Sequence, residues 1–163
     1  MSVGQCPGLV ESLEDRPFSG PAGRTLFSWL ESTGISEEEF RANAYMTAVT
    51  KCYPAPDRYG KRETPLPREV LNCARYLVSE LRIIRPEVIL AIGGMAISRL
   101  LGDMKLTDAV GKTFIRRYHS FDATVIPLPH PSGRSTWLSM GDNKTLLASA
   151  LRHAGRLCAP LLK

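Results

Sequence analysis

Short apolar runs and longer periodic segments alternate along the chain, and they predict different elements. Three short runs, at 44–49, 87–93 and 123–128, are each stopped by Gly, Pro or Lys. Runs of this kind are typical of strands buried in a parallel sheet. The segment 113–119 is a further candidate for a half-exposed strand.

Apolar residues at helical spacing occupy the segments between these strands. The predicted helices cover 26–30, 70–84, 97–101 and 146–161. Asp142 or Asn143 can cap the last of them, and Ser36 with Glu39 has the spacing of a capping box for another short helix. Proline or glycine follows most of these segments, as expected at helix ends.

Strands that alternate with helices predict a parallel sheet covered on both faces. The chain has 163 residues, enough for one domain with a good core and too few for two comfortable ones. We predict an α/β fold: a single three-layer α/β/α domain over 1–163, with a mostly parallel central sheet of about four strands. The predicted first strand is clipped, because only Met1, Ser2 and Val3 precede Gly4; either the natural chain starts further upstream or this edge of the sheet is unusually short.

Composition and charge indicate which broad classes of protein this chain can belong to. Hydrophobic residues make up 44% and charged residues 23%, without an apolar run long enough for a membrane span. The start "MSVGQCPG" does not resemble an export signal, so we expect a cytoplasmic monomer whose cysteines are not paired in disulfides. The net charge of +5 suits a polyanionic partner, although a scattered positive surface serves solubility equally well.

Ligands of an open parallel sheet bind beyond the carboxyl ends of its strands. The loops at those ends are 4–8, 51–54, 93–94 and 130–134. They supply a histidine, a polar amide, hydroxyls, glycines that permit close backbone approach, and the cations Lys51 and Arg134. The sequence therefore predicts one rim that combines these groups and can contact phosphate.

Six motifs follow one another in a fixed order along most of the chain. They are "GQCPG" at 4–8, "RPFSGPAGRTLFSWL" at 16–30, "TAVTKCYPAP" at 47–56, "REVLNCARYL" at 68–77, "IRPEVILAIGGMAISRLLG" at 84–102 and "PLPHPSGRSTW" at 127–137. Together they resemble the uracil-DNA glycosylase superfamily, most closely its iron-sulfur branch, family four, and its relatives. The joint occurrence of the two terminal motifs with "PFSGPAG" between them makes the resemblance specific.

The resemblance implies a DNA repair enzyme that hydrolyses the N-glycosidic bond of a base flipped out of the duplex. In that chemistry His130 donates a hydrogen bond to the base carbonyl that takes up charge, and the base stacks on Phe18. Gln5 and Cys6 lie where the family positions the hydrolytic water. The other residues of the implied base pocket are Gly4, Pro7 and Ala48.

The loop around the histidine is the implied DNA contact. The residues Ser132, Gly133, Arg134 and Ser135 resemble the loop that presses into the minor groove, with Arg134 as wedge or phosphate contact. Proline on both sides of His130 fixes the neighbouring φ angles and gives the histidine a rigid mount.

The sequence departs from the family pattern at two places: the motif that positions the hydrolytic water, and the position that recognises the flipped base. Cys6 replaces the Asp or Asn of the best-known uracil enzymes, and Gln5 replaces the glutamate of family four, so the motif has no carboxylate to act as a base. Ala48 stands where family four reads the uracil edge with asparagine. We therefore expect uracil first, then hypoxanthine and xanthine, as substrates.

An iron-sulfur cluster is implied by family four, where four cysteines ligate it. Cys52 and Cys73 match two of those positions, whereas Cys6 and Cys158 are poor substitutes for the N-terminal pair. We predict no metal and no cluster in this chain.

Two other functions remain open on the sequence alone. A non-catalytic relative that binds damaged or flipped bases is favoured by the altered Gln5 and Cys6, and a hydrolase of free nucleosides or nucleotides is a weaker alternative. His130 could instead be a structural residue at a strand end. Cys6 could equally be a small apolar filler of a tight loop.

Overall fold

A five-stranded sheet forms the centre of the computed structural model, which describes residues 1–54, 56, 64–133 and 136–162. Its strands are β1 (Ser2–Gly4), β2 (Met46–Ala48), β3 (Val88–Ile92), β4 (Phe114–Tyr118) and β5 (Phe121–Leu128). Their order across the sheet is β2-β1-β3-β5-β4. The predicted α/β fold with a mostly parallel sheet is confirmed, with five strands where about four were expected.

The edge strand β4 is the one strand that runs against its neighbour in this sheet. It pairs antiparallel with β5, whereas the pairs β1–β2, β1–β3 and β3–β5 are parallel. A tight hairpin turn joins β4 to β5, and His119 in that turn has a φ of 53°. Antiparallel strands can be joined by such a short turn, whereas parallel strands need a long crossover. Exposed and half-buried residues alternate along β4, and Ile115 is 74% exposed. This pattern agrees with the half-exposed strand predicted for 113–119.

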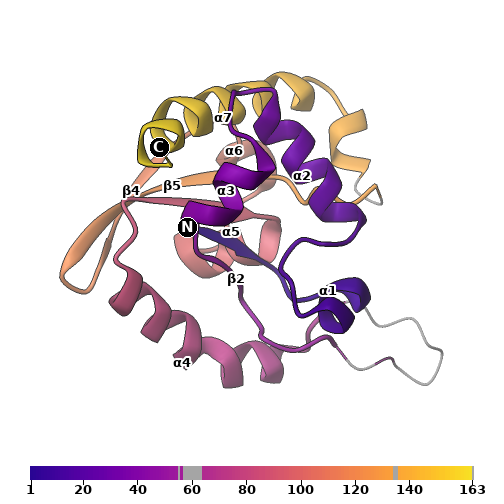
Figure 1. Ribbon diagram of the computed structural model, residues 1–163, viewed down its shortest axis with the longest axis vertical. Coiled ribbons are helices and arrows are strands. Elements are labelled where there is room, and N and C mark those ends of the chain that lie inside the picture. The colour runs from indigo at the N-terminus through magenta and orange to yellow at the C-terminus, as the bar shows by residue number, and fades with distance from the viewer. Residues whose placement is uncertain (55, 57–63, 134–135, 163) are drawn as a thin grey trace.

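Helices cover both faces of the sheet (Figure 1). The longer ones are α2 (Pro21–Glu31), α4 (Pro67–Ile84), α5 (Gly94–Leu101) and α7 (Asn143–Cys158); the shorter ones are α1 (Leu9–Glu14), α3 (Glu37–Asn43), α6 (Leu106–Ala109) and the 3₁₀ turns η1 (Thr136–Ser139) and η2 (Ala159–Leu161). None of the described helices is long and apolar enough to cross a membrane.

Strand β3 serves two hydrophobic cores because its side chains alternate between the faces. Val88, Leu90 and Ile92 pack with α2, α3 and α7, and Ile89 and Ala91 pack with α4 and α5. Figure 1 accordingly shows α2 and α7 on one side of the sheet and α4 on the other. These two layers of helices complete the predicted three-layer arrangement.

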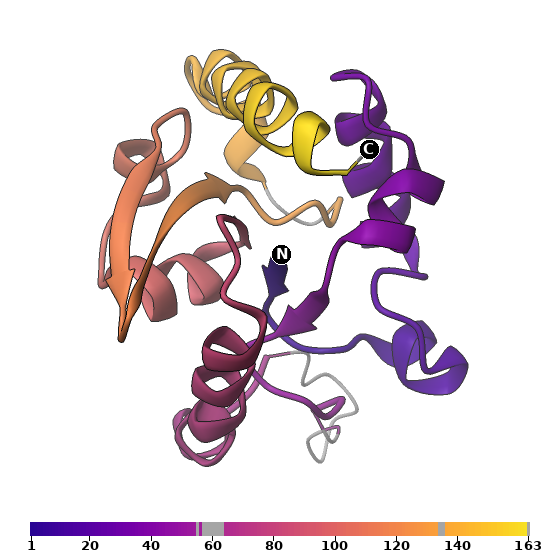
Figure 2. The same cartoon turned by 60° about the vertical axis from the view of Figure 1, so that its left-hand side comes forward.

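Local signals explain several helix ends. The capping box of α3 forms as predicted, with the Glu39 amide donating to Ser36 Oγ at 3.1 Å and the Ser36 amide to Glu39 Oε2 at 3.1 Å. The last helix ends earlier than expected, at Cys158 rather than 161, and Pro160 lies in the 3₁₀ turn that follows. The turn η2 lies beside α3 (Figure 2), and just after it the Leu162 carbonyl accepts from Asn43 Nδ2 at 2.8 Å.

Candidate active site

The loops after β1, β2, β3 and β5 meet at one edge of the sheet. Gly4 at the end of β1 lies beside Ala48 at the end of β2, and Ile92 at the end of β3 lies beside Leu128 at the end of β5. The predicted rim therefore exists, because carboxyl ends of neighbouring parallel strands open on the same edge. The residues that follow these ends include Gln5, Gly93 and His130.

His130 follows β5 and is held by its own loop. The Ser132 amide donates to His130 Nδ1 at 3.2 Å, so this nitrogen is the acceptor and the ring proton sits on Nε2. Burial lowers the pKa of His130, which keeps the imidazole uncharged near neutral pH. Pro129 and Pro131 on either side are buried. The ring is thus a neutral hydrogen-bond donor through Nε2 on a rigid mount.

Gly93, directly after β3, allows this ring to approach the backbone closely. Its φ is 88°, a conformation that L side chains rarely adopt. A Cβ atom at this position would also lie 3.0 Å from His130 Cδ2. Glycine at this position therefore leaves room for the histidine ring, and the approach of a ligand to this backbone stays a prediction.

Phe18 lies over the end of β1. A Cβ atom on Gly4 would be 3.1 Å from Phe18 Cζ, so the ring edge rests close to the Gly4 backbone. The Phe18 φ is 53°, which is uncommon for a residue other than glycine. Gly23 of α2 makes room for this loop, because a Cβ atom there would lie 1.7 Å from the Phe18 carbonyl oxygen. The structure thus brings the aromatic residue to the same strand ends as the predicted base pocket.

Gln5 and Cys6 follow β1 and are both half-buried. Burial raises the pKa of the Cys6 thiol to about 11; a hydrogen bond with Gln5 opposes the shift, and the carboxylates of Glu11 and Glu69 add to it. The thiol is therefore protonated at neutral pH and a poor nucleophile. Gln5 also lines an open cleft of about 610 Å³. The other residues along this cleft are Val70, Gly94, Met95, Ser98 and Arg99.

Lys51, expected to contact phosphate, is held inside a network of its own chain. Its Nζ donates to Glu80 Oε2 at 2.7 Å, to Thr47 Oγ1 at 2.6 Å and to the Ala48 carbonyl at 2.8 Å. An ammonium group has three protons to donate, and these contacts use all of them. The Lys51 and Glu80 side chains are 25% and 19% exposed. The network ties the end of β2 to α4.

The other predicted residues differ in exposure. Pro7, Ala48 and Ser132 are half-buried, and Gly133 is exposed, with nothing within 4 Å of where its Cβ would stand. Arg134 and Ser135 lie outside the described residues. The predicted DNA-contacting loop is therefore described only through Gly133.

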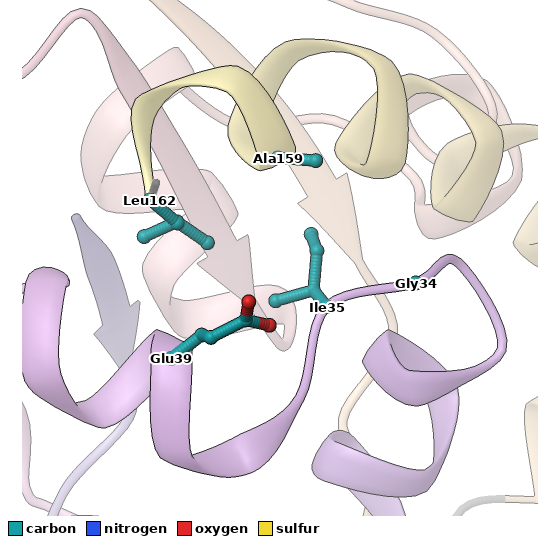
Figure 3. Close-up of a pocket in the computed structure, with 5 residues that line it drawn as sticks. All are labelled: Gly34, Ile35, Glu39, Ala159 and Leu162. Carbon is teal, nitrogen blue, oxygen red and sulfur yellow. The ribbon is translucent and has the colours of Figure 1, made fainter.

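A small cavity elsewhere has no part in this rim. It measures about 20 Å³, room for about one water molecule, and is lined by Gly34, Ile35, Glu39, Ala159 and Leu162. Figure 3 shows that these residues come from α3, the segment before it and the C-terminal turn. None of them directly follows a strand.

The sequence matches the model of a known protein family over most of its length. The family model described as "Uracil DNA glycosylase superfamily" covers residues 1–154. This chain belongs to that superfamily. The family predicted from the motifs is therefore confirmed.

Curated relatives carry the names of two branches of the superfamily. The type-4 uracil-DNA glycosylase of Archaeoglobus fulgidus is 36% identical over 135 residues, 80% of this chain and 63% of the relative. The type-4 enzyme of Thermotoga maritima is 36% identical over 105 residues, 64% and 50% of the two chains. The type-5 enzyme of Pyrobaculum aerophilum is 29% identical over 159 residues, 87% and 66% of the two. The chain thus spans only part of the length of these relatives.

The cysteines of this superfamily member differ in burial and do not gather into one group among the described residues. Cys52 is exposed, Cys73 is half-buried on α4, and Cys158 is buried at the end of α7. Burial raises the pKa of Cys158 to about 11, which disfavours the thiolate that iron requires. Over the described residues, no group of three or more His, Cys, Asp or Glu side chains is placed to hold a metal ion. The absence of a cluster stays a prediction.

Proposed function

We propose that this chain is a monofunctional DNA glycosylase that hydrolyses the N-glycosidic bond of a flipped, deaminated base. The observation that carries the proposal is His130: a neutral imidazole whose Nδ1 accepts from the Ser132 amide, leaving Nε2–H as donor. A fixed donor of this kind stabilises charge as it develops on a base carbonyl. Membership of a superfamily whose curated relatives are named uracil-DNA glycosylases supports it.

The chemistry follows from the parts at the rim. The bond between C1′ and the base nitrogen breaks, and its electron pair leaves with the base. His130 Nε2–H stabilises that negative charge, and Phe18 offers a face on which the flipped base stacks. Water adds to C1′, and its proton balances the departing base. Cys6 does not serve as the nucleophile in this scheme, because burial raises the pKa of its thiol to about 11.

The substrate class follows from the end of β2. Ala48 has no amide to read the edge of a pyrimidine, so uracil, hypoxanthine and xanthine are all candidate bases. Replacing Ala48 by Asn adds that amide and is expected to raise the uracil preference by roughly 10-fold or more, since a buried donor discriminates strongly between base edges. Relative single-turnover rates on the three bases measure it.

A second candidate function is a DNA-binding relative that holds a flipped base without cleaving it. The observation that favours it is the motif at 4–8, which has an amide and a protonated thiol where the chemistry would use a carboxylate. This candidate predicts affinity for damaged DNA without turnover.

The deciding experiment is single-turnover cleavage of labelled oligonucleotides. Each carries one uracil, hypoxanthine or xanthine in single-stranded or mismatched form, and alkali reveals abasic sites. We expect cleavage of at least one substrate and a loss of about 10²- to 10³-fold in His130→Ala. The control is His119→Asn, which replaces an exposed histidine in the β4–β5 turn and should leave the rate unchanged. Binding of every substrate without cleavage would favour the second candidate.

A further inference from the structure

Arg41 of α3 reaches the backbone of the loop that carries Phe18. Its Nη1 donates to the Pro17 carbonyl at 2.8 Å and its Nη2 to the Phe18 carbonyl at 2.9 Å. These residues are 24 and 23 positions apart from Arg41 in the chain. The planar guanidinium presents its donors in a fixed fork, so it can hold two successive carbonyls at once.

The guanidinium is itself oriented from two sides. Arg41 Nε donates to Glu37 Oε1 at 2.6 Å, one turn earlier in α3. The guanidinium carbon also lies 4.4 Å from the centroid of the Phe27 ring in α2, a cation–π arrangement. The Arg41 side chain is only 13% exposed. Both packing and charge therefore fix the direction in which its fork points.

Phe18 has need of such support. Its φ of 53° is a strained conformation for a residue with a Cβ atom, and such strain persists only where surrounding contacts enforce it. The neighbouring Ser19 Oγ is buried and has no hydrogen-bond partner, so it does not hold the loop. Gly4 and Gly23 give the segment room but no side-chain contact. Among the described residues, the Glu11 carboxylate accepts from the Gly20 amide at 2.9 Å, two residues further along, and the Arg41 fork holds the Phe18 carbonyl itself.

We propose that Arg41 is a positioning residue for the base-stacking platform: it holds Phe18 in the left-handed conformation that sets the ring over the end of β1. The inference rests on the proposed function, in which a flipped base stacks on Phe18. Arg41 does not touch the base and acts through Phe18 alone. Lysine cannot replace it fully, because an ammonium lacks the planar fork.

A double-mutant cycle tests this in single-turnover excision. Arg41→Met and Phe18→Ala should each lower the rate roughly 5- to 150-fold, the range of one lost base–aromatic stack. The double variant should be no slower than Phe18→Ala, because residues that act through one another are not additive. Multiplying losses would overturn the proposal. Arg117→Met is the matched control: it removes an exposed, ion-paired arginine from the distant β4 edge and should leave the rate unchanged.

A second readout does not depend on turnover. With fluorinated phenylalanine, the ¹⁹F resonance of Phe18, assigned by its loss in Phe18→Leu, should shift or broaden in Arg41→Met and remain in place in Arg117→Met. A Phe18 resonance that stays unchanged in Arg41→Met would overturn the proposal even if the rate falls. If the wild-type chain cleaves no substrate, the proposed function fails, and the ¹⁹F result still decides the role of Arg41.

Arg41→Lys is the second variant, for the case in which Arg41→Met does not fold. It keeps the positive charge and a single-point donor but loses the two-carbonyl fork. A rate between those of wild type and Phe18→Ala, with a shifted Phe18 resonance, supports the proposal. A wild-type rate with an unshifted resonance would overturn it, because charge alone would then suffice.

Discussion

The two sides of the proposed base pocket are held by different kinds of contact. On the β5 side, His130 is fixed by the Ser132 amide, two residues away, and by the prolines that flank it. On the β1–β2 side, Phe18 is held by Arg41, 23 residues away, and the end of β2 by Glu80, 29 residues beyond Lys51. The proposed reacting group is thus specified within one loop, whereas the platform for the base depends on the assembled fold.

The largest effect on excision should come from a change on the β5 side, where local contacts hold His130. Gly93→Ala puts a Cβ atom 3.0 Å from the His130 ring at a φ of 88°, so the ring must move. The ring has to give by a few tenths of an ångström, so we expect the single-turnover rate to fall about 10-fold, less than the roughly 100-fold cost of a displacement of about 1 Å at a reacting group. The free energy of unfolding should fall by about 1–2 kcal/mol from backbone strain.

Gly102→Ala separates the effect of backbone strain from the effect of displacing the His130 ring. Gly102 ends α5 with a φ of 90°, and nothing lies within 4 Å of where its Cβ would stand. It should lose a similar free energy of unfolding by chemical denaturation while keeping the wild-type rate. Equal loss of rate in both variants would mean that global stability, not the position of the imidazole, limits excision.

Lys51→Met disturbs the β1–β2 side of the proposed pocket, where the contacts are long-range, and we expect a smaller effect from it. It leaves Glu80 without its cation, and because the pair is partly exposed at 25% and 19%, we expect a loss of about 1–2 kcal/mol in the free energy of unfolding. The dependence of DNA affinity on salt should not change, since all three Lys51 protons have partners within the chain.

Glu80→Gln is the matched variant for the same network, because it breaks the ion pair without removing a positive charge. Both variants should show a similar loss of stability by denaturant unfolding. If Lys51 contacts phosphate as the sequence predicts, Lys51→Met alone should reduce the slope of log affinity against log salt, by about 0.9. That result would contradict the structural role assigned to the network.

The same division explains what the sequence could predict. The strand β3, the capping box of α3, and the motifs around His130 and Phe18 are readable because each signal lies within a few consecutive residues. The contacts that hold Phe18 and the end of β2 could not be predicted from the sequence. No residue near Arg41 or Glu80 in the chain indicates which loop these side chains contact in the folded protein. The short helix α1 is missed for another reason: its six residues are too few for a helical period to be recognised, and none of them is buried.

The smallest effect should appear in the dependence of stability and of the excision rate on pH. This measurement tests the His130 side of the proposed pocket without a substitution. Burial lowers the pKa of His130 below its usual value of 6.5, so the unfolded chain binds its proton first as the pH falls. The folded state is therefore favoured above about pH 6.5, and this contribution declines between that pH and the lower folded pKa.

Excision should follow the folded pKa, because protonation of Nδ1 breaks the contact with the Ser132 amide. We expect the acid limb of the single-turnover rate to fall below pH 6.5, the usual value for histidine, when rates are compared from about pH 8 to about pH 5. Unfolding measured over the same range should show a larger loss of stability in the wild type than in His130→Ala, because the Met1 amino group, whose pKa burial also lowers, titrates in both. An acid limb at or above pH 6.5 would mean that the folded imidazole is charged more readily than the free side chain, and the neutral donor proposed for catalysis would have to be abandoned.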